Sequence, residues 1–331
     1  MIDHGRHHPD VYYGSAEWSE AQVLHVAAAY SNPKRWQTRR RLFNDFRRHI
    51  SAAANVRLHV GELAYGDRPF EVTAAGHRTD HQWRTRDELW HKENILNQVV
   101  SRFPADWQYG AYLDGDFIMT RPDWALEAIH LLQHFDWVQL FSSYTDLSAD
   151  HQPLSIHAGF AYNWVEQGNR GSTRYQDGSP GGGWAFRRSA FEACGGLLDV
   201  GIVGAADHYM ARGVAGIALP VHKEIVHGTP EYRRAIATWQ ARAASLGGNI
   251  SYLSNHALHQ WHGSKSARGY NYRWKILRDF AFDPYTDLYR DWQGIYQLTP
   301  AKPGLRDALR RYFASRNEDD PTLAAHERPL V

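Results

Sequence analysis

The sequence has one cysteine, Cys194, among 331 residues. A single thiol can form neither an intramolecular disulfide nor a thiolate cluster, so any metal here must be bound by oxygen and imidazole ligands. No apolar run approaches the roughly 18 residues that a membrane-spanning helix needs. The N-terminus, Met1 to His8, has no apolar core of the kind found in secretory signals. These absences predict a soluble, cytoplasmic protein without membrane insertion.

Net charge is also nearly absent, at +1. This balance argues against a uniformly basic surface that would hold nucleic acid by charge alone. One local basic run stands out on a predicted helix, and its members are Lys34, Arg35, Arg39, Arg40, Arg41, Arg47 and Arg48. A solvated helix face is one interpretation of this run, and contact with phosphate groups is the other.

Apolar runs alternate with helical patterns along the chain. The predicted strands are 23–30, 56–60, 109–113 and 137–141, and the predicted helices are 34–50, 84–103 and 124–133. This alternation predicts an α/β fold with a mixed, mainly parallel sheet flanked by helices in a single domain. We expect an N-terminal extension at 1–21, the catalytic domain at 22–300, and a C-terminal helix with a loosely held tail at 301–331. The Gly- and Ser-rich stretch 165–183 predicts a long functional loop.

Two carboxylates, Asp114 and Asp116, follow the predicted strand 109–113 with Gly115 between them. At a strand end both can face one hard cation, and glycine lets the backbone approach a ligand closely. A chain of this length contains roughly one Asp-x-Asp by chance, so the strand context is what makes the pair informative. The alternative is a solvated turn.

A second candidate region begins at His259 and His262. Imidazole can complete the shell of a manganese-like ion that carboxylates already hold, and we expect His262 to do so, with His259 as the alternative. Lys265, Arg268 and Tyr270 follow closely and would supply hydrogen-bond donors to a diphosphate. The chain contains 20 histidines, so an ordinary structural role is the competing interpretation.

A glycine-rich stretch supplies the third set of candidates. Gly182 and Gly183 would let the backbone press against a sugar, and Trp184 could stack on a pyranose face. Asp207 begins a helix-like stretch and is a candidate general base. Its alternative role is to cap that helix.

The collinear order of these motifs resembles the GT-A glycosyltransferases over about residues 22–275. In style it is closest to the β-galactosyltransferase and polypeptide N-acetylgalactosaminyltransferase branches. The matching segments are Tyr30-Ser31-Asn32-Pro33, 92–97, Asp114-Gly115-Asp116, 182–191, 204–207 and His262-Gly263. The resemblance implies a Rossmann-like GT-A fold, a UDP-sugar donor and Mn²⁺ or Mg²⁺ as cofactor.

Site residues carry over by position in the resembled families. Tyr30 and Asn32 would border the nucleotide base, and Lys92 and Asn97 would reach nucleotide or phosphate groups. The second acidic residue of the Asp-x-Asp motif, here Asp116, would bind the metal directly.

The first acidic residue, Asp114, would contact ribose or metal. In the resembled families a later histidine completes the metal shell, which supports His262 in that role. Galactosyltransferase relatives have a Gly-Glu-Asp type sequence where this chain has Gly204-Ala205-Ala206-Asp207. The base assignment therefore depends on Asp207 alone, and the resemblance implies inverting transfer of a hexose to an acceptor hydroxyl.

The stretch 262–273 is similar to viral and bacteriophage glycosyltransferase-like proteins, some of them tied to sugar addition on hydroxymethylated DNA bases. A hydroxymethylated pyrimidine in DNA is therefore the leading acceptor prediction, and a viral protein would act in the host cytoplasm. The basic helix, with Arg78, Arg84 and Arg86, would suit a phosphate track. A saccharide, protein or lipid-linked acceptor is the alternative. Two remoter alternatives for the function are a metal-dependent nucleotide-sugar hydrolase and a non-catalytic binding module.

Overall fold

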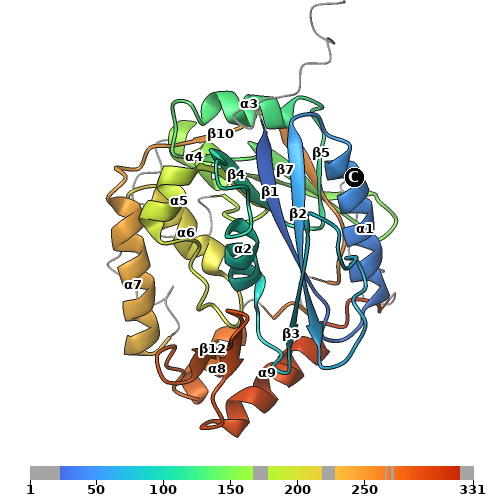
Figure 1. Cartoon of the computed structure of the whole chain (residues 1–331), viewed down its shortest axis with the longest axis vertical. Helices are drawn as coiled ribbons and strands as arrows, with labels where there is room; N and C mark the ends of the chain where they lie inside the picture. The colour runs from blue at the N-terminus through green and yellow to red at the C-terminus, as the bar shows by residue number, and fades with distance from the viewer. Residues whose placement is uncertain (1–22, 167–177, 218–227, 265–266, 270–271, 321–331) are drawn as a thin grey trace, which may run out of the picture.

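A seven-stranded mixed sheet forms the centre of the computed structural model, which describes residues 23–166, 178–217, 228–264, 267–269 and 272–320 (Figure 1). In spatial order the strands are β10 (Ile250–Tyr252), β6 (Trp137–Gln139), β9 (Gly183–Arg187), β4 (Tyr109–Leu113), β1 (Leu24–Ser31), β2 (Val56–Tyr65) and β3 (Asp80–Thr85). Only β9 runs antiparallel to its neighbours among these strands. The predicted mainly parallel sheet is confirmed.

Helices cover both faces of this sheet, in keeping with the nearly continuous burial of β1 (Figure 1). Leu24 and Val26 pack in one core cluster and Ala27 in the other, because successive side chains of a strand point to opposite faces. One cluster includes residues of α1 (Gln37–Ser51) and α3 (Trp124–Leu131). The other includes residues of α2 (Lys92–Val100), α5 (Arg188–Cys194), α6 (Ala206–Val214) and α7 (Pro230–Ala244).

A second, four-stranded sheet extends the fold beside the first. Its order is β5 (Phe117–Met119), β11 (His256–His259), β7 (Ser143–Leu147) and β8 (Pro153–Ala158). The remaining elements are α4 (Phe160–Glu166), α8 (Arg273–Asp279), β12 (Leu288–Arg290), β13 (Tyr296–Leu298) and α9 (Pro303–Ser315). Because β11 pairs with β5 directly after the Asp-x-Asp turn, this sheet joins two segments that are far apart in sequence.

The prediction of a helix over 84–103 is wrong in its first part. Residues 80–85 form β3 at the sheet edge, and the helix α2 begins only at Lys92. Trp83 and Thr85 are buried and Arg84 between them is less so, which is the two-residue period of a strand. After α9, Glu318 is fully buried, and residues 321–331 of the predicted tail lie outside the described residues.

The longest described helices, α1 and α7, have 15 residues each. None of the helices in the described ranges is long and apolar enough to cross a membrane. Cys194 is buried, and burial raises the pKa of its thiol to about 12. This cysteine is therefore a packing residue and not a nucleophile.

Candidate metal and donor site

A cavity of about 660 Å³ opens at the carboxyl ends of β1 and β4. This volume is within the range of about 300–1,000 Å³ that small-molecule sites occupy. Its wall combines the end of β1, the beginnings of α2 and α6, the turn after β4, and strands β7 and β8. Open α/β sheets bind ligands at this edge, because the strand ends leave a crevice between neighbouring loops.

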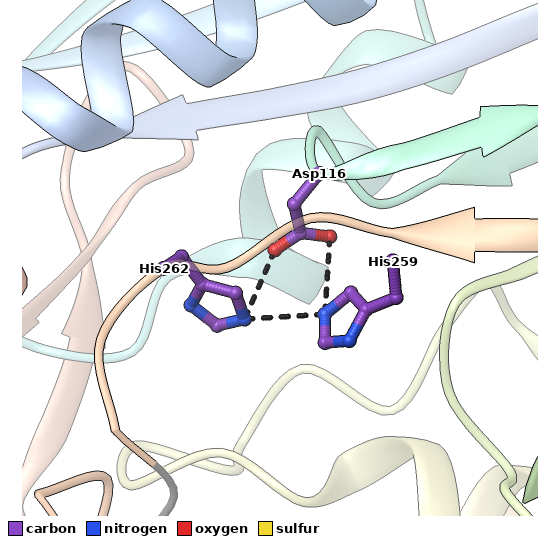
Figure 2. A group of neighbouring side chains, drawn as sticks. All are labelled: Asp116, His259 and His262. Carbon is purple, nitrogen blue, oxygen red and sulfur yellow. Dashed lines mark hydrogen bonds and ion pairs between the residues drawn. The ribbon is translucent and has the colours of Figure 1, made fainter. Parts of the chain in front are cut away.

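Asp116, His259 and His262 converge in this cavity (Figure 2). One Nε2 or carboxylate oxygen from each lies within 4.8 Å of the others. His262 Nε2 is 3.2 Å from Asp116 Oδ2, and His259 Nε2 is 3.8 Å from Asp116 Oδ1. The two Nε2 atoms are 3.2 Å apart. Pairing of β11 with β5 creates the arrangement, since it lays His259 beside Phe117, the residue after Asp116.

The donor set fits a divalent cation. Asp116 Oδ1 is buried and has no hydrogen-bond partner among the described residues. Burial opposes ionisation of Asp116, but His262 and His259 hold the pKa of its carboxyl well below the usual value. Burial also lowers the pKa of His262 well below 6.5, which favours the neutral imidazole that binds metals. One carboxylate and two imidazoles suit Mn²⁺ better than Mg²⁺, which prefers oxygen ligands.

Asp114 stands beside this group and pairs with a lysine. Lys92 Nζ is 2.7 Å from Asp114 Oδ1. Burial works against the charge of Lys92, but Asp114, Glu93 and Asp207 together raise the pKa of the ammonium well above its usual value. The two aspartates of the motif therefore have different partners, one an ammonium and the other a pair of imidazoles.

Gly182 lines the cavity and lies next to the end of β4. Its carbonyl accepts the N–H of Asp114 at 2.7 Å. Gly182 has φ +87°, and a Cβ there would lie 2.6 Å from the ring of Phe141 and 2.7 Å from that of Phe117. Only glycine fits such a position.

Asp207 also lines the cavity, from the first turn of α6. A Cβ at Gly181 would lie 2.7 Å from Asp207 Oδ2, so the glycine segment passes directly over this carboxylate. Ala205 occupies the N-cap position of α6, and Asp207 Oδ1 accepts the N–H of His208. The carboxylate is therefore placed at the cavity and not at the N-cap position.

Several residues predicted to contact the donor lie outside the cavity wall. Trp184 is buried, and its indole N–H donates to the carbonyl of Pro180 at 2.9 Å. Gly183 is buried within β9. Asn97 bonds to the backbone of Leu197 through both its amide nitrogen and its oxygen. These positions suit structural roles.

Of the two residues predicted to contact the donor at the end of β1, one lines the cavity and the other has a structural role. Tyr30 lines the cavity, whereas Asn32 accepts the N–H of Trp36 and donates to the Tyr30 hydroxyl. Asn32 therefore shapes the turn that supports the cavity wall. Arg268 lines the cavity and donates to the carbonyl of Gly263 at 3.1 Å, while Lys265 and Tyr270 lie outside the described residues.

Sequence reasoning missed an ion-pair group at the cavity formed by the segment after α9. Glu318 accepts hydrogen bonds at 2.9 Å from Nε of Arg39 and from Nε of Arg316, and both arginines line the cavity. Asp319 accepts the backbone N–H groups of Gln37 and Thr38 at 2.8 Å and so caps α1. The segment 317–320 gave no local sign of its partners on and before α1, which lie about 280 residues earlier in the chain.

The basic run 34–48, of which Lys34 and Arg35 precede α1, is largely paired within the chain. Ion pairs join Lys34 to Glu88, Arg39 to Glu318, Arg47 to Asp80 and Arg48 to Asp45. Four of the seven cations thus have acidic partners of their own. This arrangement supports a structural interpretation of the run over a phosphate track.

No protein-family model matches the chain, and no curated protein matches it. Among solved structures it is similar to the mannosyltransferase PcManGT from Pyrobaculum calidifontis in complex with GDP-Man and Mn²⁺. The identity is 14% and the TM-score 0.40, with 92% of this chain and 76% of that chain covered. A likeness this limited assigns no activity, so the function must rest on the geometry of the site itself.

Proposed function

We propose that the chain is a metal-dependent glycosyltransferase of the GT-A type that moves a sugar from a nucleotide diphosphate donor to an acceptor hydroxyl. The observation that carries the proposal is the convergence of Asp116, His259 and His262 at the carboxyl edge of the sheet, in one cavity with Asp207 and Arg268. A cation site, a carboxylate and a guanidinium are the groups that such a transfer needs.

The donor would lie across the ends of β1 and β4. Tyr30 and the ring of Phe43 line the cavity where the nucleotide base would bind. The Lys92–Asp114 pair would contact ribose or phosphate, and Arg268 would donate to the diphosphate. Asp116, His259 and His262 would hold a divalent ion, which would supply Lewis-acid stabilisation of the departing diphosphate. Within this proposal the donor is a UDP-hexose and the ion Mn²⁺ in preference to Mg²⁺.

Asp207 would be the general base. Its carboxylate would accept the proton of the acceptor hydroxyl as that oxygen attacks the anomeric carbon, which predicts an inverting transfer.

The acceptor within this proposal is a hydroxymethylated pyrimidine in DNA, with a saccharide, protein or lipid-linked hydroxyl as the alternative. The ion pairs of α1 weaken the DNA proposal, because cations that are already paired gain less from phosphate. A DNA acceptor would therefore have to contact other cations, such as Arg78 and Arg86, which are exposed.

The test is donor cleavage and transfer with Mn²⁺ and a panel of UDP- and GDP-sugars, with and without hydroxymethylcytosine DNA or saccharides, read by mass spectrometry. We expect D116N to lose metal-dependent nucleotide binding, and D207N to keep it while losing transfer. The matched control is D106N, at an exposed carboxylate remote from the cavity wall.

Each outcome decides between named functions. A hexose mass on DNA would identify the acceptor, whereas transfer to a saccharide alone would exclude DNA. Cleavage of the donor at the same rate with and without acceptors would favour the hydrolase. Absence of metal-dependent nucleotide binding in the wild-type protein would refute the proposal.

A further inference from the structure

A buried carboxylate, Asp146, lies directly behind the metal group. It is on β7, between β11 and β8 in the second sheet. In the strand register Asp146 is opposite His259 on one side and Ser155 on the other. Directly opposed residues of neighbouring strands share a face, so the register alone brings these three side chains together. Asp146 is 5% exposed, and its carboxylate lines the same cavity.

Hydrogen bonds hold both oxygens of Asp146. Oδ1 is 2.6 Å from His259 Nδ1. Oδ2 is 2.9 Å from His157 Nε2 and accepts the hydroxyl of Ser155 at 3.1 Å. Ser155 and His157 are themselves in contact at 2.8 Å. The carboxylate is therefore fixed from the β8 side while it faces His259 on the β11 side.

The contact with Asp146 decides which nitrogen of His259 carries a proton. An ionised carboxylate only accepts hydrogen bonds, so Nδ1 of His259 must be the donor. In a neutral imidazole Nε2 then has the lone pair. Nε2 is the atom that faces Asp116 at 3.8 Å and His262 Nε2 at 3.2 Å (Figure 2).

Packing limits rotation of the same ring. The His259 ring lies 4.9 Å from that of Phe117 and 5.7 Å from that of Tyr144, measured between centroids. These apolar contacts restrict the ring without distinguishing its two nitrogens. Only a polar partner can make that distinction, and Asp146 is in the position to do so.

We propose that Asp146 is a positioning residue that fixes the tautomer and orientation of His259 as a metal ligand, with Ser155 and His157 holding Asp146 in place. This inference rests on the metal site of the proposed function. Carboxylates behind metal-binding histidines typically contribute 10- to 100-fold to metal affinity.

Titration calorimetry with Mn²⁺ alone tests the proposal on the wild-type chain, D146N and D150N. Asp150 is an exposed carboxylate in the turn between β7 and β8, so D150N is the matched control. We expect D146N to bind Mn²⁺ roughly 10- to 100-fold more weakly than D150N. Thermal unfolding without metal should show whether D146N remains folded. Equal Mn²⁺ affinity of D146N and D150N would overturn the proposal.

A second measurement does not depend on any substitution at Asp146. Long-range ¹H–¹⁵N spectra of the metal-free wild-type protein, with the signals assigned by comparison with H259Q, report the tautomer of His259. We expect a proton on Nδ1, and a neutral ring protonated on Nε2 would contradict the inference. A wild-type protein that binds no Mn²⁺ would refute the metal site itself, whereas binding without sensitivity to D146N would overturn only the role of Asp146.

Discussion

Replacing Glu318 with glutamine should destabilise the fold by removing one buried charge. Glu318 is fully buried and lies between Arg39 and Arg316. Glutamine has nearly the same size, so the substitution changes charge and hydrogen bonding with little change in volume. Its amide NH₂ group would face a guanidinium, and Arg316, which is 2% exposed, would lose its charged partner.

The magnitude follows from the pKa of the carboxyl. Burial works to raise this pKa, but Arg39 and Arg316 lower it from 4.5 to about 2. A difference of this size between the unfolded and folded chains corresponds to about 3 kcal/mol of stability at neutral pH. For a chain of 331 residues the unfolding entropy is roughly 0.7 kcal/mol per kelvin. The melting temperature of E318Q should therefore fall by roughly 4–5 °C.

The dependence on pH gives this prediction its sharpest test. A carboxyl whose pKa is lowered in the fold stabilises above its unfolded value of 4.5, and this stability is lost as the pH falls toward 2. The difference between wild type and E318Q should thus shrink to less than half between pH 5 and pH 3. Urea unfolding at both values measures it, with E192Q, at an exposed ion pair, as the control. An E318Q variant as stable as wild type at pH 7, or a difference independent of pH, would refute the reasoning.

Three further predictions concern buried positions away from the metal group. Burial, with His25 and His81, lowers the pKa of His59 to about 3, so the stability of wild type relative to H59Q should fall by about 2 kcal/mol from pH 7 to pH 5. Urea unfolding of both proteins at the two pH values measures this, and a difference that does not change with pH would contradict the prediction. Burial raises the pKa of Glu93 to about 7, so its ionisation destabilises the fold as pH rises from 4.5. The gain in stability of E93Q over wild type should be roughly 2–3 kcal/mol greater at pH 8 than at pH 5, measured by thermal unfolding. In Gly61→Ala a Cβ would lie 2.5 Å from Val99 Cγ2, so this variant should lose about 1–3 kcal/mol in urea unfolding, and an unchanged midpoint would disprove the clash.

Local sequence patterns were sufficient to predict those strands and helices whose own residues show a clear apolar pattern. The apolar run 109–113 predicted β4 with its ends, and therefore placed Asp114 and Asp116 at the ligand-binding edge of the sheet. Helix α1 and strand β1 were likewise found within three residues of their ends. Residues 80–85 were not recognised, because an edge strand has weak alternation and the helical pattern after it extended the prediction backwards.

The second sheet decided the details of the metal group. The sequence motif favoured His262 as a ligand, with His259 as the alternative, and pairing of β11 with β5 and β7 brings both to Asp116. Nothing near Asp146 in the sequence points to His259, which follows it by 113 residues. Such partners depend on strand register, which is set by packing and not by local propensity.

The sequence by itself determined the residue types at the strand ends, and hence the expectation of a cation held by oxygen and imidazole. The tertiary structure alone decided that Asp114 pairs with Lys92 while Asp116 meets two histidines, and that Trp184 belongs to the core. The physical reason is the range of the interactions. A strand or helix follows from neighbours a few residues apart, whereas the partner of a buried charge is chosen by whichever distant segment the packed sheets bring beside it.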